Sequence, residues 1–341
     1  MTQWSRRRFV RGLGLATLAT ACKRAPSTAR TEETGTAPHR PEPRTPGARE
    51  LLDPGFFSMG RAPLAFDGDE LLEVRAGILI RRDASLAEVS RLPIEGVASF
   101  AVVRDRSLVV LVKTKTGGSV HHVVAGKVEA THSSFADLVL PTASPTSYWA
   151  VQANYVARTQ LANGKIDFDV QLPGNRYADT AQVTSDGSLV ISSLEGILHV
   201  DRELVTYAWN DAPKHLGPGP DATSVWASLT GSHGGPPKLA LLKLDGDRAT
   251  ATATHPLAPA EHFVHVTSHG AHAAAIVART LAPYRAAFSL VVFDVNGERW
   301  RAPLVEGSEG YFAVLSPTRV VVFETRSNAL RAFDLATGKP A

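Results

Sequence analysis

A cluster of histidines is the first feature of this sequence that could do chemistry, because imidazole is a common metal ligand. The stretch Glu261 to His272 contains His262, His265 and His269. By its place in the repeat described below, this stretch should be the inner strand of the sixth unit, and the side chains of a strand alternate between two faces. His262 and His265 then point to opposite faces and cannot bind one ion unless a bulge intervenes. We therefore expect an inner strand here rather than a metal site.

Other patterns with known chemistry are weak or missing. No Gly-x-Ser-x-Gly elbow, P-loop or dinucleotide fingerprint occurs in a suitable context. The carboxylate pairs Asp67/Asp69 and Asp245/Asp247 lie in turn-forming sequence, where such groups accept hydrogen bonds from backbone amides. The sequence therefore predicts no catalytic residue and no cofactor.

The element that organises the folded chain is a run of four short strands over residues 181–209. Short β-branched runs alternate there with Gly, Asp and Ser, which is typical of an antiparallel meander. Similar runs recur along the chain about every 40 residues, the interval of a four-stranded propeller blade. The second strands are expected to start near Leu71, Leu108, Trp149, Leu189, Val225, Ala273 and Val320.

These repeats predict an all-β fold, a β-propeller with seven four-stranded blades. Turns such as Asn163-Gly164 and Asn296-Gly297 support it, since both positions of this tight hairpin turn need positive φ. The endings AFDLATGKP and FDVNGE resemble the pyrroloquinoline-quinone-like (PQQ-like) and YVTN-type propeller repeats. Quinoprotein dehydrogenases pair adjacent cysteines, which this chain lacks, so no quinone is expected. We expect residues 51–59 to close the ring by pairing with residues 329–335, because closure removes a free sheet edge.

The N-terminus predicts export. Ser5, Arg6, Arg7 and Phe9 form a pattern that resembles the twin-arginine signal, and a short apolar segment follows. The sole cysteine, Cys22, follows Ala-Thr-Ala, which resembles the lipobox of bacterial lipoproteins and implies a lipid anchor. The alternative is an ordinary cleavable signal peptide that leaves Cys22 as an unmodified thiol.

Three regions follow from this organisation: an export signal at residues 1–21, a lipid-anchored linker at 22–50 and the propeller at 51–341. Residues 23–50 contain no bulky aliphatic or aromatic side chain, so we expect a disordered tether. The signal carries four of the 36 Lys and Arg residues, and its removal leaves 32 against 33 Asp and Glu. This balance does not indicate a nucleic-acid partner.

The longer loops fall between second and third strands or between blades, and both classes emerge on one face of a propeller. We call this the loop face and expect it to bind a protein or small-molecule partner. Its candidate residues are Lys113, Lys115, Arg176, Tyr177, Lys214, His215, His233, Arg279, Tyr284 and Arg285.

The function we expect is a non-enzymatic binding or assembly platform in the periplasm or cell envelope, anchored to the membrane through Cys22. The inner strands are mostly apolar or small, as in Ser99 to Val103, whereas enzyme propellers project acids, Asn or His towards the axis. The alternative is a propeller enzyme, such as a lactonase-like or metal-dependent hydrolase, that uses the central pocket.

Overall fold

The computed structural model describes residues 63–104, 107–115, 117–173, 181–193, 196–209, 213–230, 235–282, 285–305 and 310–341. All of them belong to the compact unit Pro46–Ala341. These residues form 27 β-strands and no helix. Accordingly, they include no helix long and apolar enough to cross a membrane.

The strands form seven consecutive antiparallel groups, which we number as blades 1 to 7. Blade 1 comprises β1 (Leu64–Asp67), β2 (Glu70–Arg75), β3 (Ile78–Arg82) and β4 (Glu88–Arg91). Blade 2 comprises β5 (Val97–Arg104), β6 (Ser107–Thr114), β7 (Gly117–Val124) and β8 (Lys127–Ser134). Blade 3 comprises β9 (Leu138–Pro141), β10 (Ser147–Gln152), β11 (Tyr155–Gln160) and β12 (Ile166–Gln171). Blade 4 comprises β13 (Gln182–Val183), β14 (Leu189–Ser193), β15 (Gly196–Val200) and β16 (Leu204–Ala208). Blade 5 comprises β17 (His215–Pro218), β18 (Ser224–Leu229), β19 (Lys238–Asp245) and β20 (Arg248–Pro256). Blade 6 comprises β21 (Glu261–His269), β22 (His272–Ala282), β23 (Arg285–Asp294) and β24 (Gly297–Pro303). Blade 7 comprises β25 (Tyr311–Leu315), β26 (Arg319–Glu324) and β27 (Ala329–Asp334).

The predicted all-β fold and its repeat are confirmed. The run at residues 181–209 forms the four strands of blade 4. Each predicted second-strand start lies inside the second strand of a blade, because those strands combine an apolar run with a turn signal just before it. The outer strands of blades 4 and 5 also touch, through a single parallel pair between Ala208 and Arg248.

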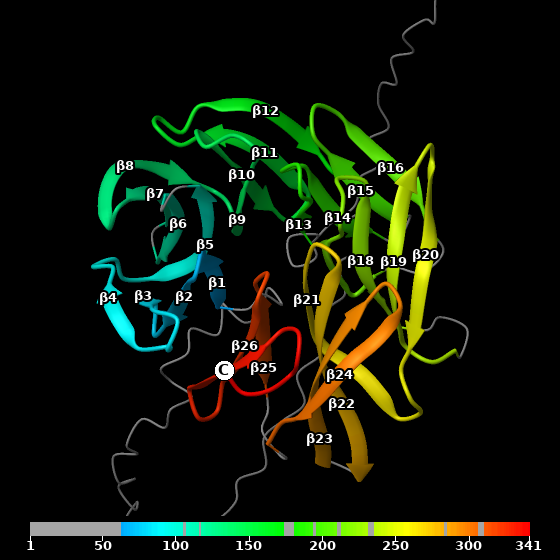
Figure 1. Ribbon diagram of the computed structural model, residues 1–341. Coiled ribbons are helices and arrows are strands. Elements are labelled where there is room, and N and C mark those ends of the chain that lie inside the picture. The colour runs from blue at the N-terminus through cyan, green and yellow to red at the C-terminus, as the bar shows by residue number, and fades with distance from the viewer. Residues whose placement is uncertain are drawn as a thin grey trace, which may run out of the picture. The chain divides into compact units, whose positions relative to one another are not determined.

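The first strand of each blade lies on the inside of a ring. The inner strands contact one another in the order β1, β5, β9, β13, β17, β21 and β25, and β25 contacts β1. Figure 1 shows the same order, with the chain passing around the ring from blue through green and yellow to red. The described part of the chain therefore forms a closed ring of seven blades.

The hydrophobic core is divided into seven clusters, each between the faces of two neighbouring blades. Adjacent residues of a second strand serve opposite clusters, because strand side chains alternate. Tyr148 packs towards blade 2, whereas Trp149 packs towards blade 4. In the same way Val225 packs towards blade 4 and Trp226 towards blade 6. Packing between the faces of neighbouring blades thus holds the ring together.

Three indole groups also join neighbouring blades by hydrogen bonds. The Nε1–H of Trp149 donates to the carbonyl of Gly187 at 2.9 Å. Trp226 donates to Gly270 at 3.2 Å, and Trp300 donates to Leu335 at 2.8 Å. Each acceptor lies in a turn of the next blade, so each of these three indoles fixes the position of a turn as well as filling a core.

Blades 1 and 7 are joined by polar contacts and by a small apolar cluster that includes Leu71 and Phe323. Arg319 of blade 7 donates to the carbonyls of Ala84 and Asp69 in blade 1. Arg75 of blade 1 donates to the carbonyl of Asn328 at 2.9 Å. Ring closure among the described residues therefore rests on side-chain contacts between the first and last blades.

Blade 7 has three full strands among the described residues. The chain turns after β27 and pairs back on its outer edge: the Asp334 N–H donates to the Lys339 carbonyl at 2.9 Å, and the Ala341 N–H donates to the Ala332 carbonyl at 3.0 Å. Residues 51–59, which we predict to close this blade, lie outside the described residues. Their predicted pairing with residues 329–335 is wrong at Ala332 and Asp334, because residues 339–341 already pair with that part of the edge. Pairing with the remainder, residues 329–331, stays a prediction.

Candidate functional site: the axial cavity and the loop face

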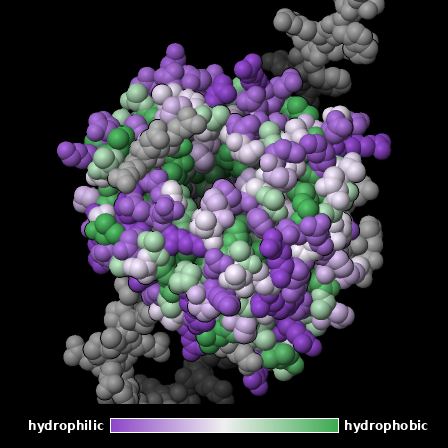
Figure 2. Space-filling model, viewed as in Figure 1, coloured by the Kyte–Doolittle hydropathy of each residue, from purple (hydrophilic) through white to green (hydrophobic). Residues whose placement is uncertain are grey.

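The largest candidate site lies at the centre of the ring. A cavity of about 380 Å³, here called the axial cavity, is lined by residues from all seven inner strands. Figure 2 shows a hollow near the middle of the viewed face, with hydrophobic residues in its wall. Cavities of this volume hold small-molecule ligands in other proteins.

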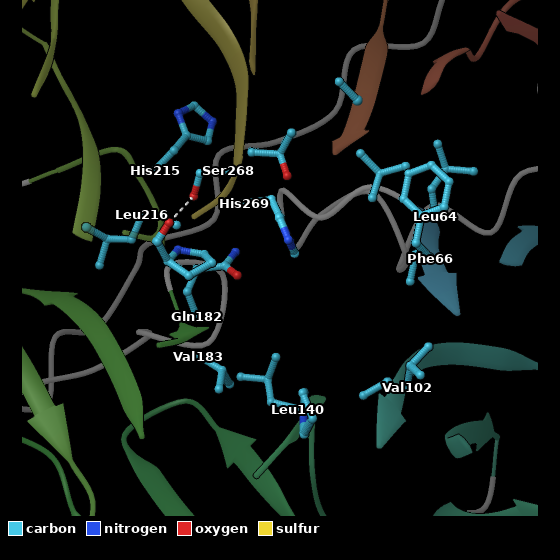
Figure 3. Close-up of a pocket in the computed structure, with 18 of the residues that line it drawn as sticks. Leu64, Phe66, Val102, Leu140, Gln182, Val183, His215, Leu216, Ser268 and His269 are labelled. Atoms are coloured by element: carbon cyan, nitrogen blue, oxygen red, sulfur yellow. Dashed lines mark hydrogen bonds between the residues drawn. The ribbon is translucent and has the colours of Figure 1, made fainter. Parts of the chain in front are cut away.

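The two sides of the axial cavity differ in chemistry. Strands of blades 1, 2, 3 and 7 contribute mainly apolar side chains, among them Phe66, Val102 and Leu140. Strands of blades 4 to 6 contribute polar ones: Gln182, His215, His265, Thr267, Ser268 and His269. In Figure 3, Gln182, Ser268 and His269 lie on one side of the pocket, and Phe66 and Val102 lie across from them.

Polar groups therefore do reach the axis, in one sector of the ring. The expectation that the inner strands are mostly apolar or small is confirmed for blades 1, 2, 3 and 7. It did not foresee the polar side chains of blades 4 to 6. Two of the missed residues, Gln182 and His215, stand at the ends of short strands next to turns or loops. Sequence offers little signal for them, because the side-chain direction at the end of a short inner strand depends on how the blade is tilted.

His215 is tied to the neighbouring strand through Ser228. Its backbone N–H donates to Ser228 Oγ at 3.0 Å, and its Nδ1 lies 2.9 Å from the same oxygen. A hydroxyl group can donate to Nδ1 or accept from it, so this contact fits either tautomer. The ring also forms a hydrogen bond with the backbone of Val264, which favours the protonated ring.

Burial keeps the His215 ring neutral. It lowers the pKa of His215 to about 4, the nearby Lys214 charge acts in the same direction, and the bond to the Val264 carbonyl opposes both. An isolated charge in such a site is unfavourable because it loses its hydration.

His265 is the most buried histidine of the cavity wall, with 6% of its surface exposed. Its ring lies 6.1 Å from the His215 ring and packs edge-on against Phe312 at 5.5 Å. Burial lowers the pKa of His265 to about 3, and the neighbouring His215 adds to this effect. Its Nδ1 is buried without a hydrogen-bond partner.

The three candidate metal ligands do not come together. A β-bulge does occur in β21, between Phe263 and His265, as a shared site would have required. His262 is nevertheless exposed and lines a cleft of about 140 Å³ beside Lys214, whereas His265 and His269 line the axial cavity. Within the described ranges, no group of three or more His, Cys, Asp or Glu residues is arranged to hold a metal ion.

The described loop-face candidates lie in or next to the expected connections, but Lys113, Arg279 and Arg285 belong to strands that extend further than predicted. Lys113 lies near the end of β6 and pairs with Asp137 at 2.5 Å, and Lys115 lies between β6 and β7. Arg279 and Arg285 lie in β22 and β23, near the connection between those strands. Lys214 is exposed and precedes β17.

The remaining candidates have different outcomes. His215 is the first residue of β17 and lines the axial cavity, so it does not belong to a loop. Arg176, Tyr177, His233 and Tyr284 lie outside the described residues, as do Ser5, Arg6, Arg7, Phe9 and Cys22.

Comparisons with known proteins identify the fold alone. No protein-family model matches the chain, and no curated protein matches it. Solved structures do match. Hsv2 of Kluyveromyces lactis is 12% identical with a TM-score of 0.58, covering 80% of this chain and 93% of that chain.

Two further structures give the same result. The β-propeller domain of Cps50 (Swd1) from Myceliophteria thermophila is 10% identical with a TM-score of 0.56, covering 80% of this chain and 95% of that one. AztD of Citrobacter koseri, solved in its apo form, is 12% identical with a TM-score of 0.52, covering 82% and 84%. Together with the ring of inner strands, these matches show that the chain folds as a β-propeller.

Proposed function

We propose that this chain is an exported, lipid-anchored β-propeller of the cell envelope that acts as a non-enzymatic binding or assembly platform. Export is supported by Ser5, Arg6, Arg7 and Phe9, and the anchor by the position of Cys22. The polar residues 23–50 would hold the propeller away from the membrane surface.

The observation that carries the binding role is the charge of the loop face. Lys115, Lys214, Arg279 and Arg285 are all exposed. Lys115 and Lys214 lie in connections that emerge on that face, and Arg279 and Arg285 lie in β22 and β23 beside another such connection. Basic groups on a rigid scaffold attract acidic surfaces and orient them as they approach. The partner that fits best is therefore a protein with an acidic surface.

The anchor is tested by Cys22→Ser. Without the thiol no lipid can be attached, so the variant should move from the membrane fraction to the soluble exported fraction. Its propeller should unfold at the wild-type temperature, because Cys22 lies far outside the blades in sequence. Wild-type protein that is wholly soluble after export and carries a free Cys22 thiol would contradict the anchor.

The loop face is tested by reversing its charge. Chemical cross-linking in intact cells should attach partner proteins to the wild type. The double variant Lys115→Glu, Lys214→Glu should no longer be cross-linked to those proteins. The matched control is Lys127→Glu, Lys165→Glu, which changes two exposed lysines near turns between third and fourth strands, on the opposite face. Equal cross-linking of both double variants would argue against the loop face as the binding surface.

One observation favours the alternative, an enzyme that uses the central pocket. Imidazole and amide side chains converge in one sector of the axial cavity. Hydrolysis of lactone or ester substrates by the wild type, lost in His269→Ala while the protein stays folded, would support the enzyme over the platform.

A further inference from the structure

The wall of the axial cavity offers apolar surface that the protein itself covers only in part. Phe66, Val102, Val183 and Val314 come from four different blades, and each is partly exposed although it belongs to an inner strand. Apolar surface of this kind favours a ligand that removes it from water.

The polar groups on the opposite wall are uncharged. They are the amide of Gln182, the hydroxyls of Thr267 and Ser268, and imidazoles. The Ser268 hydroxyl is already used, since it donates to the Pro218 carbonyl at 2.8 Å. Burial holds the pKa values of His215 and His265 far below neutrality, so these rings carry no charge at pH 7.

The amide of Gln182 can serve as the hydrogen-bonding group for a ligand, because it is half-buried, lines the cavity and carries both a donor and an acceptor. The Nδ1 of His265 does not serve this purpose, since it is buried without surface that a molecule in the cavity could touch. A bound molecule with a hydroxyl or carbonyl group can pair with the Gln182 amide while its apolar part covers Phe66 and Val102.

We infer that the axial cavity is a binding site for an uncharged, amphipathic small molecule with an apolar, ring-sized body and at least one hydrogen-bonding group. A charged ligand fits poorly, because the described side chains of the wall supply no opposite charge and an unpaired buried charge is costly. Binding at the axis is independent of the export and anchoring proposed above.

The test uses the full-length protein and three probes of similar size: naphthol, which is neutral at pH 7, naphthoate, which is anionic, and naphthylmethylammonium, which is cationic. Isothermal titration calorimetry should show one equivalent of naphthol bound, at least tenfold more tightly than either charged probe. Absence of naphthol binding, which would mean that the cavity holds water only, overturns the inference. Equal affinity for the three probes overturns it as well.

Variants locate the bound naphthol. Val102→Trp fills the cavity from blade 2 and should weaken naphthol binding at least tenfold, and Val183→Phe should do the same from blade 4 if the first variant does not fold. The matched control is Val295→Trp, the same exchange at a 43% exposed position in the turn between β23 and β24. Gln182→Leu should remove the preference for naphthol over naphthalene, because it removes the amide of the cavity wall. Unchanged naphthol binding in a folded, cavity-filled variant would overturn the inference.

Discussion

The two buried imidazoles of the axial cavity, His215 and His265, make the propeller sensitive to acid. Each is neutral in the folded protein because burial lowers its pKa, to about 4 for His215 and about 3 for His265. In the unfolded chain a histidine has a pKa of about 6.5. Between these values the unfolded chain binds more protons than the folded protein, so the stability contributed by neutral histidine falls as the pH drops below about 6.5.

His265→Phe should therefore make unfolding less dependent on pH. Between pH 7 and pH 5 one such histidine costs the folded state about 2 kcal/mol, because only the unfolded form takes up the proton. From pH 7 to pH 5 the unfolding free energy of the variant should therefore fall by about 2 kcal/mol less than that of the wild type. Denaturant unfolding at the two pH values measures this difference. His262→Phe is the control, since His262 lies on the same strand but is exposed. Identical pH dependence in the wild type and His265→Phe would mean that His265 is solvated in solution.

The same residue shows what the sequence could and could not predict at this scale. The sequence placed His262 and His265 on opposite faces by strict alternation, but the β-bulge between Phe263 and His265 breaks that alternation. The two histidines are separate because His262 is exposed and His265 is buried. The alternation did not place His265 at the axis, because that depends on contacts with His215 from blade 5 and Phe312 from blade 7. Such contacts join residues about 50 positions apart and leave no local pattern.

At the scale of the strands and turns, neighbouring blades approach each other closely at some glycines, and in the sequence the only sign of such a contact is the glycine itself. Gly187, in the turn between β13 and β14, has φ of 86° and accepts the indole hydrogen bond of Trp149. A Cβ atom at this position would lie 2.0 Å from the backbone nitrogen of Ala143 in blade 3. Both the conformation and the space therefore require glycine.

Gly187→Ala should destabilise the propeller by at least about 2 kcal/mol, because backbone strain is added to a clash with backbone that cannot move freely. Gly246→Ala is the matched control: its φ of 59° is also positive, but nothing lies within 4 Å of the added Cβ. It should cost only about 1–2 kcal/mol. Denaturant unfolding compares the two, and equal losses of stability would show that the turn of Gly187 can move away from Ala143.

The second strands were predictable for a physical reason that does not extend to the inner ones. A second strand is covered on both faces by neighbouring blades, so it appears in the sequence as an unbroken apolar run such as Leu189 to Ile191. An inner strand borders the cavity and is often short, as in β13 with two residues. An inner strand can therefore carry polar residues that line the axial cavity, because core packing does not require all of its residues to be apolar.

On the scale of the whole molecule, the ring is held by contacts between blades 1 and 7 that lie far apart in sequence. Arg75 and Arg319 each reach a backbone carbonyl of the other blade. The outer edge of β27 is covered at Ala332 and Asp334 by the chain that follows it. Among the described residues, the part of that edge from Ala329 to Arg331 pairs with no further strand. Closure of this edge is what we assign to residues 51–59.

Two truncations test this assignment. Deleting residues 23–50 should change the unfolding free energy by less than about 0.5 kcal/mol, because the segment has no bulky apolar side chain to bury. Extending the deletion through Met59 removes Phe56 and Phe57, each worth about 1.5–3 kcal/mol if buried. The longer deletion should also expose the edge at Ala329 to Arg331, and free edges promote self-association. Thermal unfolding with light scattering, run on both truncations at the same concentration, measures both effects. If the two proteins unfold at the same temperature and both stay monomeric, the contacts of Arg75 and Arg319 suffice to close the ring and residues 51–59 take no part in it.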